Sequence, residues 1–114
     1  LVPSDGYPVP PAELEGTLLG HRDVADACVI GVEDGANATE VPRAYVVLRA
    51  GIDAGEAKAQ ELMDWVAGRV APHKKLRGGV RFIKEIPKSP SGKLLRRVLR
   101  QEAKREKRGE GAKL

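Results

Sequence analysis

The sequence predicts a single α+β domain in which a small three-stranded, mainly antiparallel sheet is covered by helices. Two β-branched apolar segments, residues 24–32 and 43–49, flank a polar turn region and should pair antiparallel. A third alternating segment covers residues 80–86, and amphipathic patterns lie before, between and after these strands. The resulting order α-β-β-α-β-α is typical of a sheet with helices packed on it.

The helices are defined by their apolar spacing and by the residues that end them. The first pattern runs from Pro11 to about Leu19 and stops at Gly20, because proline suits the first helical turn and glycine the end of a helix. The second runs from about Glu56 to Ala71, where Pro72 follows. Leucine and valine recur in it at four-residue spacing, which predicts one buried face.

A third helix begins after Lys93. We expect Leu95, Val98 and Leu99 to face inward, and Arg96, Arg97 and Arg100 to face solvent. In the strand before it, Val80, Phe82 and Ile86 should share one face.

The chain therefore divides into three parts. Residues 1–5 have no periodicity and are predicted to be an irregular segment or an added remnant. Residues 6–103 form the domain, and residues 104–114 are predicted to be a charged, disordered tail.

Composition limits the compartment and the chemistry. The 114 residues contain one cysteine, Cys28, which fits a reducing cytoplasm and lies in an apolar run typical of a core position. No apolar run approaches the ~20 residues that a membrane helix needs. His21 and His73 lack metal-ligand spacing, so we predict no metal site and expect both at the surface or an interface.

Charge is distributed unevenly along the chain. Residues 1–68 carry 4 basic and 12 acidic side chains, whereas residues 69–114 carry 16 basic and 4 acidic ones. A basic half predicts an anionic partner, which could be a nucleotide, coenzyme phosphates, nucleic acid or an acidic protein surface. Charge alone does not choose among them.

The most informative segment is Pro87-Lys88-Ser89-Pro90-Ser91-Gly92-Lys93. Two prolines and a glycine predict a shaped, exposed loop between the third strand and the last helix. Lys93 stands at the end of this loop. The segment is not a phosphate-binding P-loop, because no glycine lies at the required upstream spacing and Leu94 occupies the position of the magnesium-binding hydroxyl.

This segment resembles the closing motif of the acyl-adenylate-forming enzymes. Residues 6–15, Gly-Tyr-Pro-Val-Pro-Pro-Ala-Glu-Leu-Glu, resemble the segment that opens the small C-terminal domain of the same superfamily. Both motifs occur in family order, and the chain looks most like acyl- and aryl-CoA ligases of the 4-coumarate–CoA ligase and luciferase type. Two ordered motifs are more specific than one.

The resemblance implies a lid domain of an acid–thiol ligase. Such enzymes convert a carboxylate and ATP into an acyl-adenylate and then into a thioester with coenzyme A. By resemblance, Lys93 serves adenylation, Gly6 and Tyr7 face the pantetheine of coenzyme A, and Lys88, Ser91 and Gly92 support the loop. The implied cofactors are ATP with magnesium and coenzyme A. The implied partner is the large N-terminal adenylation domain, without which this chain should neither bind them nor turn over.

Two other interpretations remain open at this stage. The chain could be the lid of a peptide-synthetase adenylation domain whose acceptor is a carrier protein. It could also be a small basic nucleic-acid-binding domain, although the scarcity of aromatic residues, with one Phe, one Trp and two Tyr, argues against a stacking platform.

Overall fold

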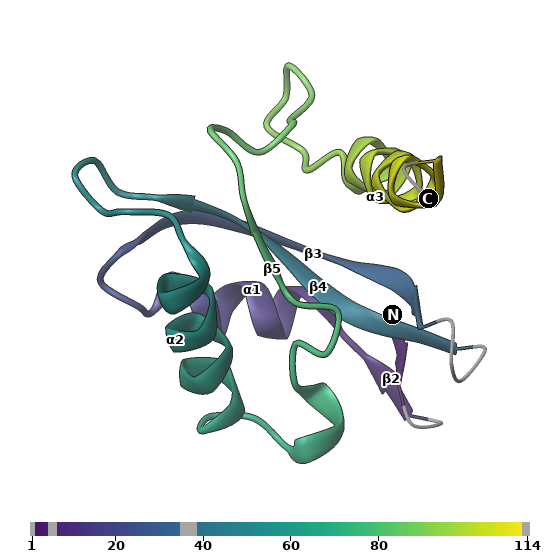
Figure 1. Ribbon diagram of the computed structural model, residues 1–114. Helices are drawn as coiled ribbons and strands as arrows, with labels where there is room; N and C mark the ends of the chain where they lie inside the picture. Colours follow the sequence, from purple (N-terminus) through teal and green to yellow (C-terminus); the bar gives the residue numbers. More distant parts are fainter. Residues whose placement is uncertain (1, 5–6, 35–38, 113–114) are drawn as a thin grey trace.

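The computed structural model describes residues 2–4, 7–34 and 39–112. Its described elements combine two small sheets with three α-helices and one 3-10 turn (Figure 1). In chain order they are β1 (Val2–Ser4), β2 (Tyr7–Val9), α1 (Pro11–Leu19), β3 (Val24–Asp34), β4 (Thr39–Leu48), α2 (Glu56–Ala67), η1 (Pro72–Lys74), β5 (Val80–Phe82) and α3 (Arg96–Ala112).

The main sheet has the strand order β3-β4-β5 and is mixed rather than mainly antiparallel. β3 and β4 pair antiparallel from Val24 opposite Leu48 to Asp34 opposite Thr39, as predicted, but both strands extend further into the expected polar turn region. β5 instead pairs parallel to β4, with Val80 opposite Ala44. Between β4 and β5 the chain returns through α2, so β5 can start at the same end of the sheet as β4 and run parallel to it. The predicted α+β class with a three-stranded sheet and covering helices is confirmed.

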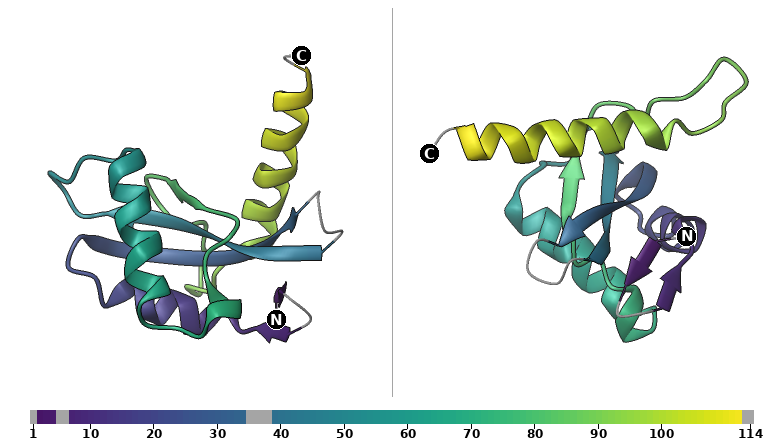
Figure 2. Two further views of the ribbon diagram at one scale, coloured as in Figure 1. Left: turned by 60° about the horizontal axis from the view of Figure 1, so that its bottom comes forward. Right: turned by 90° about the vertical axis from the view of Figure 1, so that its right-hand side faces the viewer.

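The sheet separates two apolar clusters, because successive side chains on a strand point to opposite faces. Figure 1 and the right panel of Figure 2 show α1 and α2 on one face and α3 across the other. We call these clusters the α1/α2 core and the α3 core. The buried residues of the α1/α2 core are Leu14, Leu18, Val24, Ala27, Val29, Ala44, Val46, Leu62, Val66, Leu76 and Val80. Those of the α3 core are Cys28, Ile30, Tyr45, Ile86, Leu99 and Ala103.

The third strand differs from its prediction in length and in facing. β5 ends at Phe82, although the backbone amide of Ile83 still donates to the Val46 carbonyl oxygen at 3.0 Å. Val80 and Phe82 pack in the α1/α2 core, whereas Ile86 packs in the α3 core. The expectation that Ile86 shares their face was wrong, because the chain leaves the strand before reaching it.

The helices differ from their predictions mainly at their ends. α1 has the predicted bounds, and α2 ends a turn early at Ala67, with Gly68 as its cap. α3 begins at Arg96 and continues to Ala112, so residues 104–112, for which the sequence predicts a charged, disordered tail, have a helical backbone; residues 113–114 of that predicted tail lie outside the described residues. Among the helices of the described segments, none has the length and apolar character needed to cross a bilayer.

The N-terminal residues also form structure that the sequence did not predict. β1 and β2 pair antiparallel, with Val2 opposite Val9 and Ser4 opposite Tyr7. Residues 2–4, for which the sequence predicts an irregular segment, therefore form a β-strand, and residues 1 and 5 of that segment lie outside the described residues. β1 lies against β4 and β3, which ties the beginning of the chain to the main sheet.

Candidate functional site

The loop that carries Lys93 is a small hairpin closed by its own backbone. Lys88 and Leu94 form an isolated antiparallel bridge, and the Leu95 amide donates to the Pro87 carbonyl oxygen at 2.9 Å. At the tip, the Gly92 amide donates to the Ser89 carbonyl oxygen at 2.8 Å. Gly92 has a φ of 86°, a left-handed conformation that glycine adopts without strain. The loop is therefore shaped by hydrogen bonds, as its prolines and glycine predict.

Hydrogen bonds to Ser89 hold the backbone of Lys93, while its side chain extends into solvent. Its amide donates to Ser89 Oγ at 3.1 Å, and its carbonyl oxygen accepts from the Ser89 amide at 2.9 Å. Ser91 Oγ lies 2.9 Å from the same Ser89 hydroxyl. The Lys93 side chain is exposed, and within the described residues its ammonium has neither a hydrogen-bond acceptor nor an ion-pair partner. This arrangement presents an uncompensated cation on an ordered support.

Lys88 anchors the near end of the loop to the sheet. Its Nζ lies 2.7 Å from Asp26 Oδ2, and Asp26 Oδ1 in turn accepts from the Ala27 amide at 2.9 Å. Asp26 lies where the register of β3 shifts against β4, a kind of irregularity that can redirect a side chain. Because Lys88 is paired in this way, Lys93 and Lys88 are not equivalent cations. The sequence had not identified Asp26.

Arg96 anchors the far end of the loop. Its Nη2 lies 2.7 Å from Glu15 Oε1 and 2.8 Å from Glu15 Oε2, and its Nε donates to the Val29 carbonyl oxygen at 3.3 Å. Glu15 Oε2 also accepts from the Val29 amide at 2.8 Å. The prediction that Arg96 faces solvent was wrong, since its charge is used to neutralise a buried carboxylate. This contact joins the opening motif, through Glu15, to Arg96 at the start of α3, the helix that follows the closing motif.

Cys28 lies beside this ion pair, in the α3 core. Burial, with a further contribution from the Glu15 carboxylate, raises the pKa of the Cys28 thiol to about 11. A thiol with such a pKa is protonated at neutral pH and is a poor nucleophile. The interpretation of Cys28 as a small core residue is confirmed.

The second predicted site segment is described only in part. Gly6 lies outside the described residues, and of Tyr7 the structure gives the backbone in β2, opposite Ser4. The views in Figures 1 and 2 place β2 on the α1/α2 side of the sheet, whereas the loop after β5 projects on the α3 side. The structure therefore does not bring Lys93 and Tyr7 together.

His21 is buried inside the domain, whereas the sequence predicts a position at the surface or an interface. Its Nδ1 accepts from the Asp23 amide at 3.0 Å, so Nε2 carries the proton that bonds to Glu61 Oε2 at 2.8 Å. His21, Asp23 and Glu61 bring potential metal ligands within 4.8 Å of one another. However, Lys58 Nζ donates to both carboxylates, which lowers the pKa of Asp23 and of Glu61. The Lys58 ammonium already lies where a metal ion would have to bind, so His21, Asp23, Glu61 and Lys58 form a structural ion-pair network.

The family model described as the AMP-binding enzyme C-terminal domain matches residues 13–93. The chain belongs to this family. The match begins in the opening motif and ends at Lys93, so it spans the segment from α1 to the end of the hairpin loop.

Individual members of the AMP-binding C-terminal family are similar over most of this chain. A provisionally assigned acyl-coenzyme A synthetase of Emericella nidulans is 52% identical over 100% of this chain and 20% of its own length. A luciferin 4-monooxygenase of Nipponoluciola cruciata is 48% identical over 89% of this chain and 18% of its own length. The crystal structure of a Brucella canis acyl-CoA synthetase superposes with a TM-score of 0.85 and 35% identity, over 94% of this chain and 20% of that one. The chain thus spans about a fifth of the length of the relatives it matches.

Proposed function

We propose that this domain is the lid of an adenylate-forming acyl- or aryl-CoA ligase and that Lys93 is its adenylation lysine. The observation that carries the proposal is the exposed ammonium of Lys93, which has no partner among the described residues, on a loop that is anchored at both ends. The parent reaction joins a carboxylate to ATP, releases pyrophosphate, and transfers the acyl group to the thiol of coenzyme A. Relatives named as acyl-CoA synthetase and as 4-coumarate–CoA ligase-like protein support this class.

The chemistry explains why a free cation is needed. In adenylation a carboxylate must approach the α-phosphate of ATP, and both groups are anions. A lysine ammonium placed between them reduces their repulsion and stabilises the charge that develops in the transition state. A lysine already paired to a carboxylate, as Lys88 is to Asp26, would bring much less net charge to the site.

Thioester formation, the second half-reaction, would use the opposite side of the domain. Gly6 and Tyr7 would face the pantetheine of coenzyme A, while Lys88, Ser91 and Gly92 would keep the Lys93 loop in shape. The large N-terminal domain would hold ATP with magnesium and the acyl group. The separation of β2 from the Lys93 loop across the sheet supports a domain that turns between two orientations. A carrier-protein pantetheine remains the alternative acceptor.

The test uses the complete enzyme and measures the two half-reactions separately. Lys93→Ala should reduce adenylate formation by about a hundredfold or more, because a positioned cation in a water-poor site contributes on the order of 3–4 kcal/mol. Thioester formation from a supplied acyl-adenylate should be largely preserved. Pyrophosphate exchange reports the first step, and consumption of the coenzyme A thiol reports the second.

Lys88→Ala is the matched control, since it removes a lysine from the same loop. It should affect adenylation less than Lys93→Ala, because its ammonium is already engaged with Asp26. The assignment of Lys93 would be wrong if both half-reactions fell equally in Lys93→Ala, or if Lys88→Ala were the more damaged enzyme.

A further inference from the structure

The place to which Lys93 can deliver its charge depends on the backbone that carries it. Within the described residues its side chain has no hydrogen-bond acceptor and no ion-pair partner. A lysine stem is flexible, so a displacement of the Lys93 backbone also displaces the ammonium. The contacts that fix this backbone therefore fix the reach of the cation.

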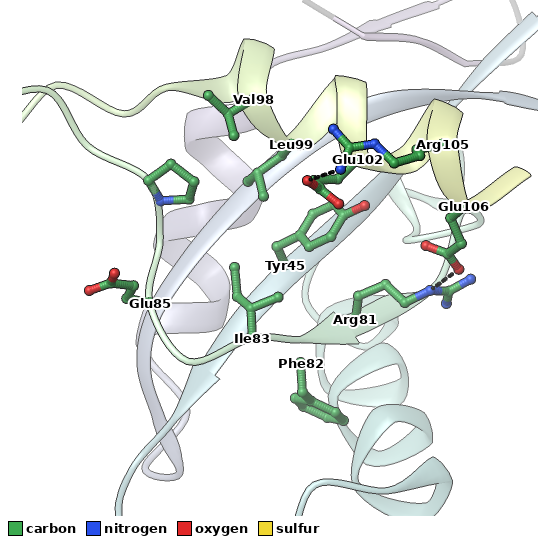
Figure 3. Close-up of a pocket in the computed structure, with 11 residues that line it drawn as sticks. Tyr45, Arg81, Phe82, Ile83, Glu85, Val98, Leu99, Glu102, Arg105 and Glu106 are labelled. Carbon is green, nitrogen blue, oxygen red and sulfur yellow. Dashed lines mark hydrogen bonds and ion pairs between the residues drawn. The ribbon is translucent and has the colours of Figure 1, made fainter. Parts of the chain in front are cut away.

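The base of the hairpin loop is ordered by contacts that do not involve its tip. Ile83, before the loop, and Leu94, at its end, both pack against the α3 core. Figure 3 shows Val98 and Leu99 pointing from α3 toward Ile83, so the helix after the loop lies against the segment that leads into it. The tip, residues 89–93, lies beyond these apolar contacts and depends on its own hydrogen bonds.

Every hydrogen bond described within this tip involves Ser89. Its carbonyl oxygen accepts from the Gly92 amide at 2.8 Å, and its amide donates to the Lys93 carbonyl oxygen at 2.9 Å. Its Oγ accepts from the Lys93 amide at 3.1 Å and lies 2.9 Å from Ser91 Oγ. Both backbone polar groups of Lys93 are thus bonded to one residue, and a side chain makes one of these two bonds.

Serine suits this position in two ways. A hydroxyl has one donor and two acceptor positions, so Ser89 Oγ can accept from the Lys93 amide and still bond to Ser91 Oγ. Pro90 follows, and a proline restricts the residue before it to extended backbone, so Ser89 has little conformational freedom to lose. Alanine at position 89 would keep the backbone bonds and remove both side-chain bonds.

We propose that Ser89 is a positioning residue whose hydroxyl holds the Lys93 backbone where the ammonium can reach the reacting anions. This role rests on the proposed function of Lys93, because Ser89 acts through Lys93 and does not contact the substrate. Reacting groups have to be aligned closely, so a small displacement of a charged group lowers the rate while substrate binding is little affected.

The first test is independent of catalysis and uses the chain itself. In Ser89→Ala the Lys93 amide loses its acceptor, so its exchange with solvent, followed by NMR, should become about three- to tenfold faster. The Leu95 amide, bonded to the Pro87 carbonyl oxygen, should keep its rate because the base of the loop is intact. Ser89→Thr retains the hydroxyl and should restore slow exchange. The unfolding midpoint of Ser89→Ala should change by less than about 4 °C, since the amide it frees can bond to water.

The second test uses the complete enzyme and separates kcat from KM. Ser89→Ala should lower kcat for adenylate formation about three- to tenfold and leave the KM for ATP nearly the same. Thioester formation from a supplied acyl-adenylate should be preserved, and Ser89→Thr should recover adenylation. Ser91→Ala removes only the bond between the two hydroxyls, so its loss should be smaller than that of Ser89→Ala.

The decisive comparison is made in the Lys93→Ala enzyme. Adding Ser89→Ala to it should cause no further loss of adenylation, because there is no ammonium left to position. A residue that acted directly on the substrate, or that stabilised the domain as a whole, would lower the rate again.

Two results in the chain would overturn the role of Ser89 whatever the reaction: unchanged exchange of the Lys93 amide in Ser89→Ala, or a large fall in the unfolding midpoint of that variant. Two results in the enzyme would also overturn it: full adenylation activity in Ser89→Ala, or a double variant that loses as much again as Ser89→Ala alone. Full adenylation activity in Lys93→Ala is a different outcome, since it would refute the proposed function of Lys93 and the role of Ser89 with it.

Discussion

Replacing Arg96 by alanine should destabilise this domain far more than replacing its neighbour Arg97. Arg96 holds the Glu15 carboxylate with two contacts, at 2.7 and 2.8 Å, and the Glu15 side chain is only 9% exposed. Arg96→Ala would leave that carboxylate buried without its cation, although the Val29 amide would still donate to it. Arg97 is exposed on the same helical turn and has no role in this network.

The size of the effect follows from the burial of the two partners. Removing one member of a fully buried pair costs about 3–5 kcal/mol, because the other charge is left unpaired. Here the Arg96 side chain is 30% exposed, so water could partly hydrate Glu15 after the substitution. We therefore expect a loss of about 2–3 kcal/mol in the free energy of unfolding. For a domain of this size that corresponds to a decrease of about 8–12 °C in Tm.

Thermal and urea unfolding, followed by the fluorescence of Trp65, would measure this difference. Arg97→Ala should stay within about 0.5 kcal/mol of the unmodified chain, as exposed substitutions usually do. The double variant Glu15→Leu/Arg96→Leu should be more stable than Arg96→Ala, because it leaves no unpaired charge. The reasoning would be refuted if Arg96→Ala and Arg97→Ala were equally stable, or if the double variant were the least stable of the set.

Two further predictions concern the α3 side of the sheet. Burial raises the pKa of the Cys28 thiol to about 11, so iodoacetamide at pH 8 should alkylate the folded chain much more slowly than the urea-unfolded chain. Mass spectrometry would measure the two rates, and equal rates would contradict a buried, protonated thiol. Truncation after Lys104 removes Glu106 and its contacts with Arg81 and Arg43, so the free energy of unfolding should fall by roughly 1 kcal/mol. Glu106→Gln should reproduce part of that loss, and an unchanged urea midpoint in the truncated chain would show that the end of α3 does not pack.

Local patterns in the sequence predicted the elements whose structure depends on near neighbours. The β3–β4 hairpin follows from two β-branched segments around a polar turn, and α1 from a proline start and a glycine stop. The shape of the Lys93 loop follows from Pro87, Pro90 and Gly92 for the same reason. The role proposed for Lys93 rests on the family motifs, because no periodicity in the sequence indicates it.

The errors occurred where distant segments decide the outcome. Arg96 has the spacing of a solvent-facing residue, yet it turns inward because it pairs with the buried carboxylate of Glu15 in α1. The end of α3 lacks an apolar stripe, yet Ala103 packs on the sheet and Glu106 pairs with Arg81. His21 looked isolated because Glu61, its partner, is 40 residues away. None of these contacts leaves a signal at short range in the sequence.

The contact between Glu15 and Arg96 also constrains the order in which the chain folds. It joins residues that are 81 positions apart, whereas β3 ends at Asp34 and its partner strand β4 begins as near as Thr39. Closing so long a loop is entropically unfavourable until other contacts have shortened it. We therefore expect the hairpin with α1 and α2 to assemble first and α3 to dock late onto a sheet that already exists. The Lys93 loop, held between Lys88 and Arg96, would then acquire its final shape only in that last step of folding.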